Sequence, residues 1–173
     1  AFLDADIEVP LNWLLLWTQV QENNSAEVLA LDCDTPACGP WYARAWQRRS
    51  LSGRRQNRLR EWLPSPNLCL TSSWFRQAGG FAEDLSTGED KDFSLRLRQA
   101  GARLLSMAEP VVWHWGYEKS WGEWLGKEMW RQGSHLQLLR SSEHKLCLLR
   151  FPLLCLAEGL LTFLALAFLI GGY

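Results

Sequence analysis

Residues 87–101 read Thr-Gly-Glu-Asp-Lys-Asp-Phe-Ser-Leu-Arg-Leu-Arg-Gln-Ala-Gly, and they predict a helix over 90–100 with an acidic beginning. Gly88 lets the chain turn immediately before the acids. Peptide N–H groups at a helix start favour negative charge, so the adjacent carboxyl groups of Glu89 and Asp90 are compatible with this position. Two carboxylates held at one end of a helix are also candidates for chemistry.

The first acidic cluster along the chain comprises residues 2–6, which read Phe-Leu-Asp-Ala-Asp, and the acids of residues 89–92 form the second. Apolar residues that run into Asp-x-Asp predict a buried strand whose end presents carboxylates to a divalent cation. We therefore expect Asp4 and Asp6 to form one active site together with Glu89 and Asp90.

Further motifs follow in a fixed order. Asn67 opens a predicted strand, residues 79–81 read Gly-Gly-Phe, and residues 111–114 read Val-Val-Trp-His. Together with the two acidic clusters, this order resembles the inverting glycosyltransferases of family 2, which have the GT-A fold. The resemblance covers about residues 1–135 and implies an α/β fold with a Rossmann-like mixed sheet flanked by helices.

The resemblance also implies roles for individual residues. Asp90 corresponds to the catalytic base, which takes the proton of an acceptor hydroxyl as that hydroxyl attacks the sugar. Asp6 corresponds to the metal-binding aspartate and Asp4 to the donor-binding residue nearer the ribose. The expected cofactor is Mg²⁺ or Mn²⁺. His114 is either a second metal ligand or a hydrogen-bonded histidine of the sheet.

The acceptor side is predicted from the glycine-rich turn. Gly79, Gly80, Phe81 and Glu89 are expected to shape an acceptor pocket, because glycines let a substrate approach the backbone. The implied partners are a nucleotide-sugar donor and a glycan or lipid-linked acceptor of the cell envelope. Processive synthases of this family carry Q-x-x-R-W, whereas residues 137–141 lack the tryptophan, so we expect transfer of a single sugar, as by a hexosyltransferase.

The beginning of the chain differs from the family pattern. Family members place their first nucleotide-binding strands before the Asp-x-Asp motif, but this chain starts at Ala1, within the motif's own strand. We therefore expect residues 1–140 to be the C-terminal part of a catalytic domain, poorly active alone. Residues 141–173 are expected to form a hydrophobic helix that associates with a membrane.

Charge excludes one class of partner and suggests another. The net charge of −1 argues against a general nucleic-acid binder. Between Pro40 and Arg60, however, there are seven arginines and no acid. This segment is either a solvated, partly disordered loop or a surface for phosphate groups, such as those of anionic lipids or of a polyprenyl phosphate acceptor.

The C-terminal sequence indicates a membrane. Residues 151–173 contain a single charge, Glu158, and their length suits a bilayer span of about 20 residues. A buried core helix or a re-entrant segment is the alternative, since the purely apolar part is short. Basic residues precede the segment and none follows it, which places the catalytic part in the cytoplasm.

A helical region is predicted over 119–139, with Trp121 and Trp124 on one side. These tryptophans either belong to the core or form the face of a helix that lies on a membrane surface.

Two other functions remain open. A haloacid-dehalogenase-type phosphatase also uses an apolar Asp-x-Asp strand, although Ile7, Glu8 and the Gly-Gly-Phe turn fit it badly. A membrane-attached scaffold that keeps the fold without turnover is the non-enzymatic alternative.

Overall fold

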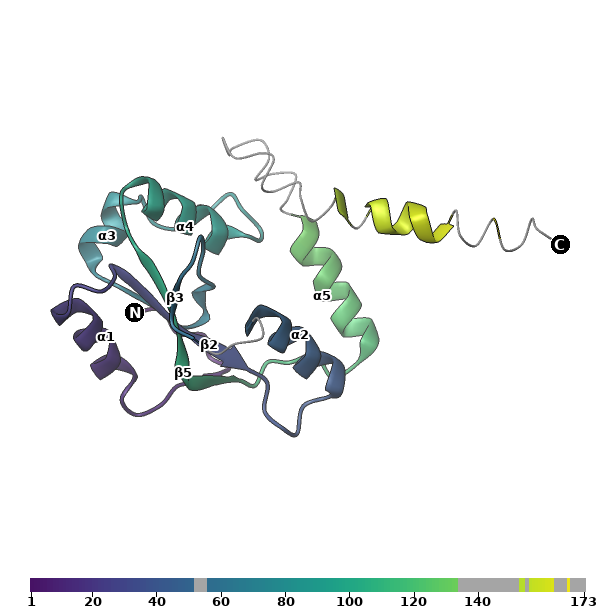
Figure 1. Ribbon diagram of the computed structural model, residues 1–173, viewed down its shortest axis with the longest axis horizontal. Helices are drawn as coiled ribbons and strands as arrows, with labels where there is room; N and C mark the ends of the chain where they lie inside the picture. Colours follow the sequence, from purple (N-terminus) through teal and green to yellow (C-terminus); the bar gives the residue numbers. More distant parts are fainter. Residues whose placement is uncertain (52–55, 134–152, 155, 164–167, 169–173) are drawn as a thin grey trace. The chain divides into compact units, whose positions relative to one another are not determined.

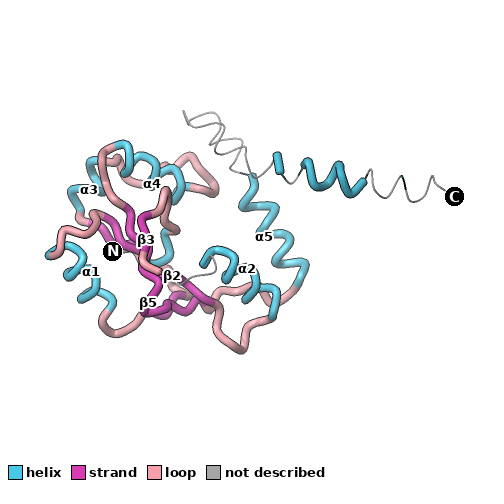
Figure 2. Tube along the Cα trace, viewed as in Figure 1, coloured by secondary structure: helices cyan, strands magenta, loops and turns pink. Residues whose placement is uncertain are grey.

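The computed structural model describes residues 1–51, 56–133, 153–154, 156–163 and 168. The chain divides into two compact units, Ala1–Arg131 and Gln132–Tyr173. The first unit contains one sheet with helices on both of its faces (Figures 1 and 2), which confirms the prediction of an α/β fold with a mixed, helix-flanked sheet.

The sheet has the order β1-β5-β2-β4, and β3 also pairs with β5. The strands are β1 (Ile7–Glu8), β2 (Val28–Asp34), β3 (Arg58–Leu59), β4 (Leu68–Leu70) and β5 (Leu104–His114). The β2–β5 pair is parallel, whereas β1–β5, β2–β4 and β3–β5 are antiparallel. The long strand β5 therefore contacts three others and supports most of the sheet.

The core lies on both faces of β2, which is buried along its whole length. Side chains alternate between the two faces of a strand. Val28 and Ala30 accordingly pack with Phe93 of α4 (Glu89–Gln99), and Leu29 packs with Trp13 of α1 (Trp13–Glu22) on the other face. This double coverage explains the almost uninterrupted apolar sequence at the start of β2.

Two details differ from what the sequence predicts. The spacing of Leu11, Leu14, Leu15 and Trp17 predicts the packing face of α1, but the helix buries Trp13 and Val20, and Leu14 and Leu15 are more than half exposed. The sequence also predicts strands over 102–106 and 111–115, and most of their residues are indeed extended, but within the single strand β5. That strand carries the cis Glu109–Pro110 bond, and the pairing register with β2 shifts there. Proline cannot donate a ladder hydrogen bond, so it occupies an irregularity rather than ending the strand.

In its described part, residues 40–51 and 56–60, the arginine-rich segment is mostly helical rather than a loop. Residues Trp41–Leu51 form helix α2, and β3 follows within the same segment. Arginine and alanine are good helix formers, and Ala43 is buried, so local propensity and packing agree here. A short 3₁₀ helix, η1 (Ser65–Asn67), then leads into β4 and α3 (Ser72–Gln77).

The predicted helical region after β5 is present as α5 (Trp121–Gly133). The expectation that its tryptophans are core residues is wrong for Trp121 and Trp130, which are more than half exposed. Within the described parts of the chain, no helix is long and apolar enough to cross a bilayer. Residues 156–163 are helical, but most of the predicted hydrophobic helix over 141–173 lies outside the described residues.

Candidate active site

The first acidic cluster forms a turn rather than the end of a buried strand. The Phe2 N–H donates to the Leu68 carbonyl (2.7 Å) and the Asp4 N–H to the Pro66 carbonyl (3.0 Å), so this segment runs beside the start of β4. The Ile7 N–H then donates to the Asp4 carbonyl (3.2 Å). Because these residues lie at the edge of the sheet, Leu3 is 46% exposed and the predicted strand is absent.

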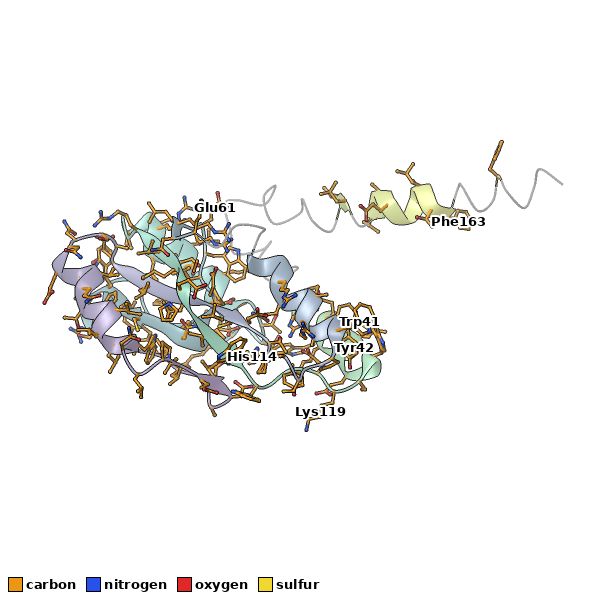
Figure 3. All side chains as sticks on the ribbon, turned by 60° about the horizontal axis from the view of Figure 1, so that its bottom comes forward. Trp41, Tyr42, Glu61, His114, Lys119 and Phe163 are labelled. Atoms are coloured by element: carbon orange, nitrogen blue, oxygen red, sulfur yellow. The ribbon has the colours of Figure 1, made fainter. Side chains whose placement is uncertain are left out.

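The turn places Asp6 beside His114. Ile7 pairs with His114 in the β1–β5 ladder, and the Trp115 N–H donates to the Asp6 carbonyl (2.8 Å). As a result, Asp6 Oδ2 lies 3.4 Å from His114 Nε2. His114 is at the end of β5, where Figure 3 labels it. The two residues predicted as metal ligands are thus adjacent, although 107 residues of sequence lie between them.

Asp6 and His114 by themselves do not complete the coordination shell of a metal ion. Among the described residues, no group of three or more His, Cys, Asp and Glu side chains could hold a metal ion. Magnesium usually keeps several waters and is held by one or two carboxylates plus substrate phosphates. Asp6 and His114 therefore fit a cation that arrives with a phosphorylated substrate better than a permanent structural metal.

Gly116 is a site residue that sequence reasoning missed. A Cβ atom at this position would collide with the Asp6 carboxylate and would lie 3.1 Å from His114 Nε2. Any side chain larger than hydrogen would push the pair apart. The only sequence signal was a glycine two residues after the histidine.

The second acidic cluster begins α4, as predicted. Gly88 precedes the helix with a φ of 77°, and Glu89, Asp90 and Asp92 all lie in the first turn. Asp90 Oδ1 accepts a hydrogen bond from the Lys91 N–H (2.7 Å). Burial raises the pKa of Asp90 to about 6, and the charge of Glu89 adds to this, against the opposing effect of the Lys91 N–H bond. Asp90 is therefore a carboxyl group that can exchange a proton near neutral pH.

A pocket of about 150 Å³ joins the two clusters. Its lining residues are Phe2, Asp4, Ser65, Phe81 and Glu89. The structure thus brings together two residues of the first cluster, Phe2 and Asp4, one of the second, Glu89, and one of the Gly-Gly-Phe turn, Phe81. Asp90 is the immediate neighbour of Glu89 but does not line this pocket itself.

The apolar side of the pocket belongs to a cluster of four phenylalanine rings, Phe2, Phe75, Phe81 and Phe93. Neighbouring ring centroids lie 4.6–6.0 Å apart. The glycines of the turn position Phe81 within this cluster. Gly79 and Gly80 have φ values of 77° and 70°, and a Cβ atom on Gly80 would lie 3.0 Å from the Phe75 ring. These glycines are required by the turn, while Phe81 is the residue that faces the pocket.

Arg96 connects the acidic helix to that turn. Its guanidinium group donates to Asp92 Oδ2 through Nε (2.9 Å) and Nη2 (2.7 Å), and through Nη1 to the carbonyl of Ala78. Arg96 thus pairs with an acid of its own helix. Asp92 consequently has a structural role, which leaves Glu89 and Asp90 as the acids available at the helix start.

Three aspartates lie around the buried thiol of Cys33, near the end of β2. Burial raises the pKa of Cys33 to about 12, the Asn67 amide lowers it, and the charges of Asp32, Asp4 and Asp6 raise it. Asp32 Oδ1 accepts a hydrogen bond from the Ser106 hydroxyl (2.6 Å). Sequence reasoning missed Asp32, although the Asp-Cys-Asp run at the end of a buried strand was a visible signal.

Comparison with known proteins gives a partial similarity. No protein-family profile matches the chain. A 73-residue segment, 42% of the chain, is 34% identical to a protein described as pre-mycofactocin glycosyltransferase from Mycobacterium tuberculosis (strain CDC 1551 / Oshkosh). The same values hold for a protein of that description from strain ATCC 25618 / H37Rv. The matched segment spans 15% of each relative, so part of this chain is similar to a small part of a glycosyltransferase.

Proposed function

We propose that this chain forms the acceptor side and the metal side of a glycosyltransferase active site. The observation that carries the proposal is the single pocket that contains Asp4, Phe81 and Glu89 beside the buried carboxyl group of Asp90. The partial similarity to a glycosyltransferase supports the same reaction class. The order of motifs favours the inverting enzymes of family 2 with the GT-A fold.

The donor would be a nucleotide sugar held at the first acidic cluster. Asp6 and His114 would hold Mg²⁺ or Mn²⁺, and Asp4, which lines the pocket, would face the donor. When bound, such an ion neutralises the charge that develops on the departing diphosphate. Gly116 serves this arrangement by leaving room for both ligands.

Asp90 would act as the base of a single displacement. Its ionised carboxylate takes the proton of the acceptor hydroxyl while the hydroxyl oxygen forms a bond to the anomeric carbon. The bond from that carbon to the diphosphate oxygen breaks at the same time, and the diphosphate leaves with the electron pair. Attack from the face opposite the leaving group inverts the configuration. A pKa of about 6 keeps the group ionised at neutral pH and still able to accept a proton.

The acceptor would be a glycan or lipid-linked hydroxyl compound at a membrane. Phe81 and Phe2 offer the pocket an apolar side, and Glu89 and Ser65 offer hydrogen-bond acceptors or donors. We further propose that residues 151–173 associate with the membrane and that the catalytic part faces the cytoplasm, because Arg140, Lys145 and Arg150 precede that segment.

The test is a screen of donor turnover by the full-length protein with UDP-, GDP- and dTDP-sugars and manganese. Wild type is compared with Asp90→Asn and with Asp84→Asn, a matched control that removes an exposed carboxylate on the loop before α4. We expect metal-dependent nucleotide release from wild type and from Asp84→Asn, and loss of release from Asp90→Asn. A folded protein that releases nucleotide from no donor would instead favour the scaffold alternative.

A further inference from the structure

Helix α5 has its apolar side chains on the outside. Trp121, Leu125, Met129 and Trp130 are 53%, 55%, 69% and 58% exposed, respectively. At 100° per residue, Trp121, Leu125 and Met129 fall on one side of the helix, whereas Trp130 lies about 140° away from the centre of that side. A helix that packs on a protein in water normally shows the opposite arrangement.

The charged side chains of α5 face the protein. Lys127 Nζ and Arg131 Nη2 lie 3.4 Å and 3.0 Å from Oε1 of Glu118, a residue that is only 4% exposed. Burial opposes ionisation of Glu118, but its own backbone hydrogen bond and the charges of Lys127 and Arg131 outweigh burial, so the pKa of Glu118 is lowered. If α5 rotated about its axis to bury its apolar side chains, the Glu118 carboxylate would lose its partners Lys127 and Arg131. An unpaired buried charge is strongly destabilising.

Aromatic stacking fixes α5 against α2. The ring of Trp121 lies 4.6 Å from that of Tyr42 and 5.5 Å from that of Trp41, and Trp124 stacks on Trp46 at 5.6 Å. Trp41 is itself 67% exposed, so it extends the apolar face of α5. Figure 3 shows Trp41 and Tyr42 beside α5. We call Trp41, Trp121, Leu125 and Met129 the outer face.

Positive charge lies next to the outer face. The Arg48 side chain on α2 is 60% exposed, and its Nε lies 3.9 Å from Oδ2 of the buried Asp34. The segment from Pro40 to Arg60 itself contains no acid. The first acid of α5, Glu123, accepts a hydrogen bond from the Lys119 N–H (2.9 Å) and so caps its own helix. Tryptophan and basic residues that flank an apolar face are the combination found in helices that lie in a membrane interface.

We propose that the outer face docks on the surface of an anionic lipid bilayer, with Leu125 and Met129 in the acyl region and the tryptophans at the level of the headgroups. The arginines of α2 would contact lipid phosphates. A second protein chain is a poorer fit, because charged residues are not arranged around the outer face to specify one partner. This surface is separate from residues 151–173 and does not depend on the transfer reaction.

Photo-cross-linking on the full-length protein tests this, because it locates each lipid contact independently of the C-terminal sequence. The probe is a lipid with a photoreactive group in its acyl chain, in vesicles of phosphatidylglycerol and phosphatidylcholine. Trypsin cleaves after Lys119, Lys127 and Arg131, so residues 120–127 and 128–131 can be recovered as separate peptides. We expect labels on both peptides and more labelling than with phosphatidylcholine alone.

The internal control is another group of exposed apolar side chains, Leu11, Leu14 and Leu15 around the start of α1. These leucines should remain unlabelled if lipid contact requires more than exposure. The double substitution Leu125→Glu with Met129→Glu should lower labelling of both α5 peptides about tenfold or more, whereas Leu14→Glu with Leu15→Glu should not. Labels confined to residues 151–173, equal labelling without anionic lipid, or protein-to-protein cross-links through α5 would each overturn the proposal.

Discussion

The two acidic clusters use the same residue type in opposite environments. Asp6 lies in a turn at the sheet edge with 46% of its side chain exposed, beside a histidine and an obligatory glycine. Asp90 lies at the start of a helix, where burial raises its pKa to about 6. An exposed carboxylate can exchange water for a cation, whereas a buried one is suited to exchange a proton. Environment, rather than residue identity, separates the two proposed roles.

Replacing Asp90, the carboxyl group with the raised pKa, should have the largest effect on the transfer rate. Asp90→Asn removes the base and should lower the transfer rate about 10²- to 10⁴-fold. The wild-type rate should also fall as the pH decreases through about 6, because protonated Asp90 cannot accept a proton. Steady-state kinetics over a pH series measure both effects. A variant that keeps the wild-type rate and pH profile would assign the base to another residue.

Replacing Asp6, the exposed carboxylate, should instead change how the activity depends on the metal concentration. Asp6→Asn should raise the manganese concentration needed for half-maximal turnover by roughly 10- to 100-fold, by analogy with losses at other metal sites. The transfer rate should still fall as the pH decreases through about 6, since Asp90 is unchanged in this variant. Metal titrations of activity for Asp6→Asn and Asp84→Asn give the measurement and its control. An unchanged metal requirement would place the cation elsewhere.

Gly116→Ala tests the first cluster without removing either ligand. The added methyl group would displace the Asp6 carboxylate from His114, so we expect a smaller rise in the manganese requirement, of about tenfold. Gly122→Ala is a suitable control, because a Cβ atom there meets no other atom within 4 Å. Equal metal requirements for the two variants would show that the adjacency of Asp6 and His114 does not matter for turnover.

The smallest expected effect concerns stability. The folded chain binds the Asp90 proton more tightly than the unfolded chain, so this residue favours folding below about pH 4, and the benefit is lost as the pH rises through about 6. Asp90→Asn should therefore raise the free energy of unfolding at pH 8, on the order of 2 kcal/mol, and change it little at pH 4. Urea unfolding at both pH values measures this difference. Asp6→Asn should not raise the free energy of unfolding at pH 8. An Asp90→Asn variant that is less stable than wild type at pH 8 would contradict the raised pKa of Asp90.

The sequence predicted elements whose local signals agree with their packing. The acids between Gly88 and Phe93 specify the start of α4, and the apolar run before Asp32 specifies β2. Predictions failed where tertiary contacts decide the outcome. The sequence of α5 does not reveal that Glu118 is buried and turns the charged side inward, nor that α2 gains its packing from Trp121 and Trp124.

For the candidate site too, the sequence identifies residues but not how they are grouped in space. Asp4, Asp6, Glu89, Asp90 and His114 are identifiable from their motifs, but their grouping depends on strand order. Gly116 and Asp32 belong to no motif that we recognised, because their importance comes from neighbours that are distant in sequence. The space around a ligand is a property of the folded backbone.

The side chain of Asn67 has a consequence for engineering. Its amide nitrogen donates to the Leu31 carbonyl (3.0 Å) and its amide oxygen accepts from the Leu31 N–H (2.6 Å). One side chain thus imitates the next rung of the β2–β4 ladder, which lets the backbone leave the sheet there without exposing the edge of β2. The segment from Thr35 to Trp62 therefore leaves the β2–β4 pairing intact, although its own strand β3 pairs with β5. A replacement segment from a related protein would bring another helix in place of α2, provided that it keeps the residues that pair with β5.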